Sequence, residues 1–284
     1  MMDADTRSRY KVWVWKKIFR RVIVPSVLLL TLLIGSIFGL RMINNDNEDA
    51  DDVEEGLLDQ PAVSIVPTYQ DFDFSIYNEN EIVEVDPAYL NSYLVLINKV
   101  FRLPENFSPQ NLVVPEVFSA WGHDNTNHRL RETAARALED MFRAAYEDGG
   151  LTLWITSGYR TFEDQADTYR YFVDTHGLEE AENMSARPGH SEHQTGLVAD
   201  VTAASVGALL VEEFSNAPEG VWLRENAHRF GFIIRYPDGR MDLTGFGYEP
   251  WHIRYVGIEA ATYIFENDIV LEQYIFPHPK WEQP

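Results

Sequence analysis

Two short segments, residues 185–202 and 249–252, constrain this chain more than any other feature, because they bring together side chains that bind metals. The first reads SARPGHSEHQTGLVADVT and the second reads EPWH. Together they offer His193, Asp200 and His252, which are two imidazoles and one carboxylate. A catalytic zinc ion typically takes three such ligands and leaves a fourth position to water. The set therefore predicts a zinc site with these three ligands.

The residues around the ligands predict two neighbouring strands. In residues 197–202, positions 198, 200 and 202 alternate with apolar positions, so one face carries Asp200 and the other enters the core. Residues 251–256 form a second such pattern, with His252 and Arg254 on one face. We expect the two strands to bring Asp200 and His252 together, with His193 reaching the site from the preceding loop.

Glu249 precedes His252 by three residues and is expected close to the metal without being a ligand. A carboxylate in that place can take a proton from a metal-bound water. Glu249 is therefore the predicted general base.

Three motifs in this order resemble the VanY-type D-alanyl-D-alanine carboxypeptidases, which are zinc peptidases of the D-Ala-D-Ala metallopeptidase family. The motifs are SGYR at 157–160, SEHQTG at 191–196 followed by Asp200, and EPWH at 249–252. The resemblance extends over residues 89–274. One departure is His190, which stands where an aromatic residue such as tyrosine is expected and would alter the rim of the pocket.

The resemblance also assigns substrate contacts. It implies that Arg160 faces the scissile carbonyl and supports the developing oxyanion, a role that suits a guanidinium because it stays charged and has a fixed fork of donors. The sequence places Arg160 between a strand at 151–156 and a helix that Thr161 opens as N-cap. Three further residues are expected to contact substrate: Gln165, Ser191 and Trp251.

The order of the elements predicts an α+β fold with a small antiparallel sheet that carries the zinc site and is flanked by helices. Helical spacing predicts helices at 89–100, 129–147, 205–214, 221–230 and 257–266, together with a helix from 161 through 171 and a strand at 231–236. Helices and short strands mix without a βαβ repeat, which favours α+β over α/β.

The N-terminal region predicts a membrane anchor. Residues 22–40 carry no charge and would span about 28 Å as a helix, close to the thickness of a hydrocarbon core. The preceding segment is basic: it contains Arg7, Arg9, Lys11, Lys16, Lys17, Arg20 and Arg21. This asymmetry predicts a cytoplasmic tail at 1–21 and a transmembrane helix at 22–43. A cleaved signal peptide is the rival interpretation, but no small-x-small cleavage site follows.

The remainder is predicted to lie outside the cell membrane. Residues 44–62 form an acidic linker and residues 63–284 a catalytic domain. The net charge of −22 makes nucleic acid an unsuitable partner, since phosphate binding needs basic side chains. The absence of cysteine excludes disulfides, thiolate zinc sites and a cysteine nucleophile.

The sequence thus predicts a membrane-anchored zinc D,D-carboxypeptidase that removes the terminal D-alanine from peptidoglycan stem peptides. Two alternatives stay open within the same family, an L,D-carboxypeptidase and a peptidoglycan endopeptidase. A third alternative is an inactive module that binds the cell wall, although the intact ligand set and Glu249 argue against it.

Overall fold

The computed structural model describes residues 82–120 and 126–276. The chain divides into two compact units, Met1–Ile65 and Val66–Pro284, and all the described residues belong to the second. The predicted cytoplasmic tail, transmembrane helix and acidic linker lie outside the described residues. Within the described part, no helix is long and apolar enough to cross a membrane.

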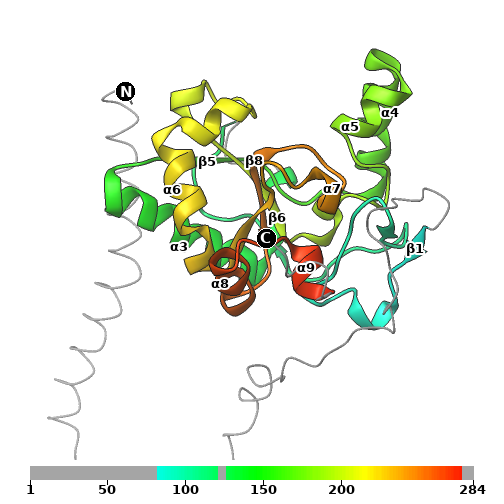
Figure 1. Ribbon diagram of the computed structural model, residues 1–284, viewed down its shortest axis with the longest axis horizontal. Helices are drawn as coiled ribbons and strands as arrows, with labels where there is room; N and C mark the ends of the chain where they lie inside the picture. Colours follow the sequence, from blue (N-terminus) through cyan, green and yellow to red (C-terminus); the bar gives the residue numbers. More distant parts are fainter. Residues whose placement is uncertain (1–81, 121–125, 277–284) are drawn as a thin grey trace, which may run out of the picture. The chain divides into compact units, whose positions relative to one another are not determined.

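A four-stranded antiparallel sheet forms the centre of the fold (Figure 1). Its strands are β5 (Leu153–Ser157), β6 (Val198–Ala203), β7 (Phe232–Tyr236) and β8 (Glu249–Tyr255), in the spatial order β5-β6-β8-β7. Every neighbouring pair is antiparallel. The predicted small antiparallel sheet is therefore confirmed.

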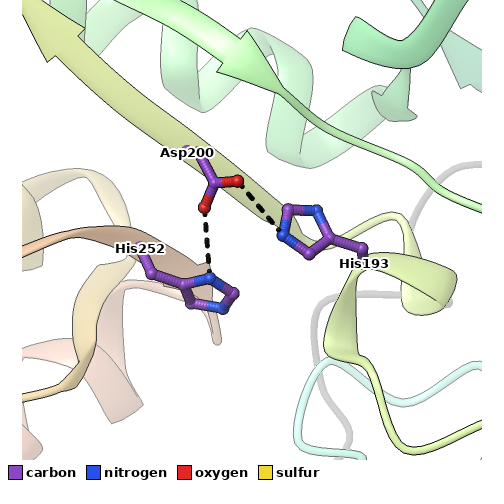
Figure 2. Close-up of side chains that lie close together, drawn as sticks. All are labelled: His193, Asp200 and His252. Atoms are coloured by element: carbon purple, nitrogen blue, oxygen red, sulfur yellow. Dashed lines mark ion pairs between the residues drawn. The ribbon is translucent and has the colours of Figure 1, made fainter. Parts of the chain in front are cut away.

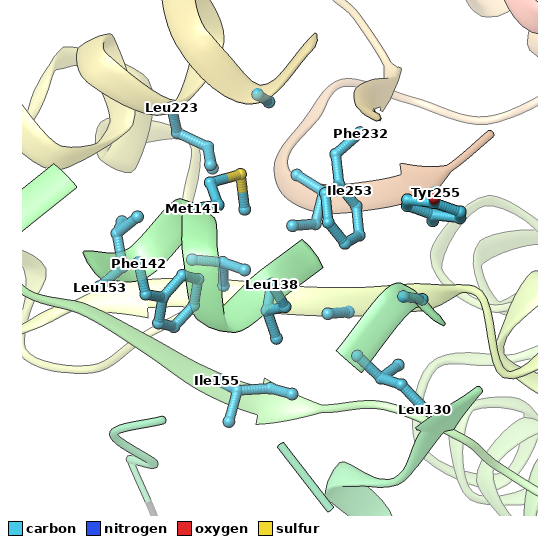
Figure 3. Packing of buried hydrophobic residues seen from close by; sticks show 14 of the residues in the cluster. Leu130, Leu138, Met141, Phe142, Leu153, Ile155, Leu223, Phe232, Ile253 and Tyr255 are labelled. Atoms are coloured by element: carbon cyan, nitrogen blue, oxygen red, sulfur yellow. The ribbon is translucent and has the colours of Figure 1, made fainter. Parts of the chain in front are cut away.

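One face of this sheet packs against the hydrophobic core, and the other face carries the predicted metal ligands. On β6, Ala199 and Val201 enter the main hydrophobic core, and on β8 Ile253 does the same. Figure 3 shows Ile253 near core side chains of other elements, among them Met141 of the long helix at residues 132–149. Because side chains alternate along a strand, Asp200 and His252 point to the opposite face.

Helix α3 (Glu132–Gly149) covers the core face of the sheet. Its buried residues recur at helical spacing, and they are Ala134, Ala135, Leu138, Glu139, Met141, Phe142 and Ala145. Gly150 ends the helix with φ = 67°, a left-handed conformation in which its N–H donates to the carbonyls of Ala145 and Tyr146. The helix predicted at 129–147 is confirmed, with both ends shifted by two or three residues.

Helix α4 (Phe162–His176) begins where the sequence places it. Thr161 is the N-cap, its hydroxyl accepts a hydrogen bond from Asp164 N, and the Asp164 carboxylate accepts one from Thr161 N in return. Together with α5 (Leu178–Met184), it stands away from the central sheet (Figure 1). The junction of β5 and α4 therefore presents Arg160 at one end of the sheet.

The remaining elements complete the α+β architecture. They are the helices α6 (Pro218–Asn226), α7 (Met241–Thr244), α8 (Ile258–Glu266) and α9 (Leu271–Ile275), the parallel pair β1 (Val83–Glu84) and β2 (Phe101–Arg102), and the antiparallel pair β3 (Leu112–Val113) and β4 (Leu130–Arg131). A second apolar cluster joins α8 and α9 to Ile233 and to the segment before β2. The helices predicted at 221–230 and 257–266 correspond to α6 with the 3-10 helix Ala227–Phe230, and to α8.

The helix predicted at 89–100 is wrong. The structure has a short 3-10 helix at Pro87–Tyr89 and turns after it. Arg254 donates hydrogen bonds to the carbonyls of Tyr93 and Val95, at 2.9 and 2.7 Å. Arg131 does the same for two carbonyls just before them. The backbone carbonyls of this segment thus accept hydrogen bonds from arginine side chains far away in the sequence, and not from amides of a helix.

The helix predicted at 205–214 is also wrong. Two 3-10 helices, Ala204–Val206 and Glu212–Asn216, occupy this region. Between them Gly207 and Ala208 have φ values of 68° and 63°. A right-handed helix cannot contain such residues, so the chain turns there.

Candidate metal centre and active site

The three predicted metal ligands come together at one place. Asp200 and His252 are paired across β6 and β8, and His193 reaches them from the 3-10 helix Glu192–Thr195. His193 Nε2 lies 3.3 Å from Asp200 Oδ2, and His252 Nδ1 lies 3.2 Å from Asp200 Oδ1 (Figure 2). All three side chains are buried.

This arrangement fits a tetrahedral metal ion. One ligand atom from each residue can be chosen so that all three lie within 4.8 Å of one another. Ligand atoms at about 2.0–2.2 Å from a tetrahedral zinc lie about 3.3–3.6 Å apart. Each imidazole lies at about this distance from one of the two Asp200 oxygens, His193 from Oδ2 and His252 from Oδ1. In addition, Asp200 Oδ1 is buried and has no hydrogen-bond partner among the described residues. A cation would supply the missing partner.

The orientation of His193 is fixed by the backbone. Its Nδ1 donates to the carbonyl of Gly158 at 2.6 Å, which leaves Nε2 free to bind a metal. Gly158 must be glycine, because a Cβ there would lie 2.7 Å from the carbonyl oxygen of Arg129. The SGYR motif therefore supports a metal ligand as well as carrying Arg160.

Glu249 lies beside the ligands at the start of β8. Its Oε2 is 3.5 Å from His252 Nδ1. Burial, reinforced by the charge of Asp200, raises the pKa of Glu249 to about 7, against the opposing effects of His252 and Arg160. A carboxylate with this pKa can exchange a proton near neutral pH, as a general base must.

The ligands perturb one another in the protein without metal. Burial alone lowers the pKa of His252, but the carboxylates of Asp200, Glu192 and Glu249 outweigh it and raise that pKa to about 9. Burial opposes ionisation of Asp200, yet His193 and His252 hold its pKa well below the usual range. The carboxylates thus stabilise positive charge on His252, and a metal ion bound there would take the place of a proton.

Arg160 faces the same site and is held by its neighbours. Its guanidinium donates to Gln165 Oε1 at 2.8 Å and to Ser157 Oγ at 3.3 Å. Gln165 is buried, and its amide donates in turn to the carbonyl of Ala186 at 2.6 Å. Gln165 therefore orients Arg160, a task that the sequence did not assign to it.

A cavity of about 590 Å³ opens in front of the ligands. Glu249 and the four residues predicted to contact substrate all line it, and these four are Arg160, Gln165, Ser191 and Trp251. His190 lies outside its lining and donates to the carbonyl of Asn98 at 2.8 Å instead. His190 therefore holds the segment before β2 in place and does not form part of the cavity wall.

Comparison with known proteins agrees with this geometry. Residues 127–258 match the family model described as VanY, D-alanyl-D-alanine carboxypeptidase. The protein named "Putative carboxypeptidase YodJ" of Bacillus subtilis (strain 168) is 40% identical over 211 residues, which cover 72% of this chain and 77% of that protein. The chain belongs to the VanY family of D-alanyl-D-alanine carboxypeptidases.

Two solved structures extend the comparison of this VanY-family protein. The LdcB LD-carboxypeptidase is 39% identical, with a TM-score of 0.64 over 71% of this chain and 97% of that chain. A D,D-pentapeptidase VanY from a VanB-type resistance cassette, solved in complex with Zn(II), is 34% identical, with a TM-score of 0.52 over 64% and 98% of the two chains. The predicted α+β fold and the membership of a metallo-carboxypeptidase family are confirmed.

The sequence did not single out Glu192 of this VanY-family protein. Its side chain is fully buried, and Oε1 accepts hydrogen bonds from Arg235 at 2.9 Å and from Arg254 at 2.7 Å. Although burial opposes ionisation, the two arginines hold the pKa of Glu192 well below its usual range. Strand alternation placed Arg254 on the same face as His252, but it did not identify Glu192 as the partner of Arg254.

Proposed function

We propose that this protein is a zinc D,D-carboxypeptidase that removes the terminal D-alanine from peptidoglycan stem peptides. One observation carries the proposal: the imidazoles of His193 and His252 lie 3.3 and 3.2 Å from the carboxylate oxygens of Asp200. All three side chains line a cavity that Glu249 and Arg160 also line. Two nitrogens and one oxygen suit zinc and leave a fourth position for water or substrate. The zinc complex of the related VanY enzyme supports the same choice of metal.

The chain's own residues have distinct tasks in the proposed reaction. Zinc bound by His193, Asp200 and His252 would polarise the attacking water and the scissile carbonyl. Glu249 accepts the proton of the water during the attack and then gives it to the leaving amine of D-alanine. Arg160 donates hydrogen bonds to the carbonyl oxygen as negative charge develops there.

The proposed activity can be tested with defined substrates. Full-length protein in detergent is incubated with a pentapeptide stem ending in D-Ala-D-Ala and with the matching tetrapeptide, and the products are identified by mass spectrometry. We expect release of one D-alanine from the pentapeptide, lost on chelation and restored by zinc. A zinc-loaded wild-type protein that leaves both peptides intact, while Glu249→Gln behaves identically, would contradict the proposal.

An L,D-carboxypeptidase is the second candidate function. The LdcB LD-carboxypeptidase aligns with this chain at a TM-score of 0.64, above the 0.52 of the zinc-bound VanY structure. In this case the tetrapeptide would be the preferred substrate of the same assay. Internal cleavage of cross-linked peptides would instead indicate the endopeptidase, and zinc-independent binding to cell walls without hydrolysis would indicate the inactive module.

We also propose the cell membrane as the place of action. Support comes from the uncharged segment 22–40 and the basic segment before it, which favour a single-pass helix at 22–43 with the tail 1–21 in the cytoplasm. The acidic linker 44–62 then separates the membrane from a catalytic domain at 63–284. Peptidoglycan lies on the outer side of the membrane, so this orientation brings enzyme and substrate together.

A further inference from the structure

A group of four buried charged side chains lies directly behind the metal ligand His252. Glu192 lies in the 3-10 helix that carries His193, Arg254 lies on β8, Arg235 on β7 and Glu272 on α9. All four are fully buried. Glu272 binds Arg235 through both oxygens, at 2.9 and 2.6 Å. Burying a charge costs free energy unless an opposite charge lies close to it. The pairing of these four side chains leads from residue to residue toward His252.

The pairing within the group leaves one oxygen of Glu192 unused. Oε1 of Glu192 accepts from both Arg235 and Arg254. Oε2 is buried and has no hydrogen-bond partner among the described residues. It lies 3.9 Å from Nε2 of His252, which is also buried and equally lacks a hydrogen-bond partner there. The two atoms without partners therefore face each other.

His252 needs a proton acceptor at this nitrogen. Its Nδ1 points to Asp200 and Glu249, at 3.2 and 3.5 Å, so Nδ1 is the atom that can bind a metal. A neutral imidazole that binds through Nδ1 carries its proton on Nε2. A movement of about 1 Å would bring Nε2 into hydrogen-bond range of the Glu192 carboxylate.

We propose that Glu192 is a positioning residue, which accepts a hydrogen bond from His252 Nε2–H and so presents Nδ1 to the metal. Arg235 and Arg254 hold the Glu192 carboxylate in place, and Glu272 balances the second arginine charge. This inference rests on the proposed zinc site. The two histidine ligands then differ, because His193 donates to a neutral carbonyl whereas His252 donates to a carboxylate, which makes it the more basic ligand.

Metal binding by two matched variants of the full-length protein tests this role. Glu192→Gln removes the charge that faces His252. Glu272→Gln removes an equally buried charge that pairs with the same Arg235, whereas the ion pair with His252 belongs to Glu192. Zinc affinity is measured by competition with a chelating dye, the absorption spectrum of the Co²⁺-loaded protein reports the geometry of the ligands, and urea unfolding reports stability.

We expect both variants to unfold at lower urea concentration, and Glu192→Gln alone to bind zinc about 10–100-fold more weakly with a shifted Co²⁺ spectrum. Equal zinc affinities and unchanged spectra in the two variants would show that Glu192 is merely structural. If wild-type protein binds no zinc, the proposed function fails as well. If wild-type protein binds zinc and the variants do not differ, only the role of Glu192 fails.

A measurement on wild-type protein covers the case in which Glu192→Gln does not fold. Histidine labelled with ¹⁵N reveals by NMR which ring nitrogen carries the proton in the zinc-loaded protein. We expect His252 to be protonated at Nε2, with a downfield proton signal typical of a hydrogen bond to a carboxylate. A His252 ring that binds zinc through Nε2 would leave Glu192 with no proton to accept and would overturn the proposal.

Discussion

Asp200 and His252 are direct neighbours across β6 and β8, and their side chains meet with Asp200 Oδ1 3.2 Å from His252 Nδ1. Strand register therefore sets the geometry of the proposed metal site. A slip of one residue would turn His252 toward the core face, where Ile253 now lies, and would break the site. The packing of Ile253 and its neighbours in the core thus keeps the ligands in place.

Removal of one ligand should remove the metal. We expect His252→Ala to reduce bound zinc from one ion per chain to nearly none, because two ligands and water hold zinc far less tightly than three ligands. Elemental analysis after gentle purification measures this. His176→Ala, which changes an exposed histidine at the end of α4, should keep its zinc. Full zinc content in His252→Ala would show that the ligand set is wrong.

Glu249→Gln should separate chemistry from metal binding. Glutamine keeps the size of the side chain but cannot accept the proton, so turnover should fall by about 10²–10⁴-fold while zinc content is unchanged. Steady-state release of D-alanine and elemental analysis check the two parts. Glu259→Gln, on the exposed face of α8, serves as the control. Loss of zinc in Glu249→Gln would identify Glu249 as a ligand instead.

Arg160→Ala should lower turnover by about 10²–10³-fold and leave zinc bound, as expected for a donor to the oxyanion. Arg160→Lys keeps the charge but loses the fork that binds Gln165 and Ser157, so we expect it to recover only part of the activity. The matched control is Arg170→Ala, because Arg170 lies exposed on α4. Wild-type turnover in Arg160→Ala would exclude a catalytic role.

The raised pKa of Glu249 predicts a pH dependence of stability in the protein without metal. Its pKa is about 7 in the folded state, against an ordinary value of 4.5. Between these values the folded protein holds a proton that the unfolded chain has lost, so the contribution of Glu249 to the free energy of unfolding falls as pH rises. Because the side chain is 26% exposed, solvent reduces the effect.

Urea unfolding of the zinc-free protein between pH 4.5 and 7.5 measures this contribution as the difference between wild type and Glu249→Gln. We expect wild type to lose stability relative to the variant as pH rises. The difference is needed because neighbouring groups titrate with their own signs; His252, with a pKa of about 9, stabilises the fold below pH 6.5 and loses that effect toward pH 9. A constant difference would mean that the pKa of Glu249 is not raised.

The predicted membrane topology, with the C-terminal domain outside the cytoplasm, can be tested with a reporter fusion. A reporter enzyme that works only outside the cytoplasm should be active when fused after Pro284, and the protein should stay with the membrane fraction after a high-salt wash. Replacing two leucines of segment 22–40 with arginine should abolish reporter activity, because charge at the centre of the segment opposes insertion. A soluble native protein that begins between residues 41 and 56 would indicate a cleaved signal peptide instead.

Local patterns in the sequence were sufficient for the elements nearest the proposed site. Alternation along residues 197–202 predicted which face of β6 carries Asp200, and the spacing of Thr161 and Asp164 predicted the start of α4. Both depend on interactions within a few residues, which is why the sequence alone determined them. The ligand set likewise followed from residue types and motif spacing, and the structure brings these residues together.

Tertiary structure decided the features that depend on distant residues. In place of the helix predicted at 89–100, the chain turns, and the carbonyls of Tyr93 and Val95 accept hydrogen bonds from Arg254, which lies far away in the sequence. The group around Glu192 joins side chains from the loop before β6, from β7 and β8, and from α9. No local pattern reveals such partners, because the cost of burying each charge is offset only once the folded chain brings the opposite charge to it.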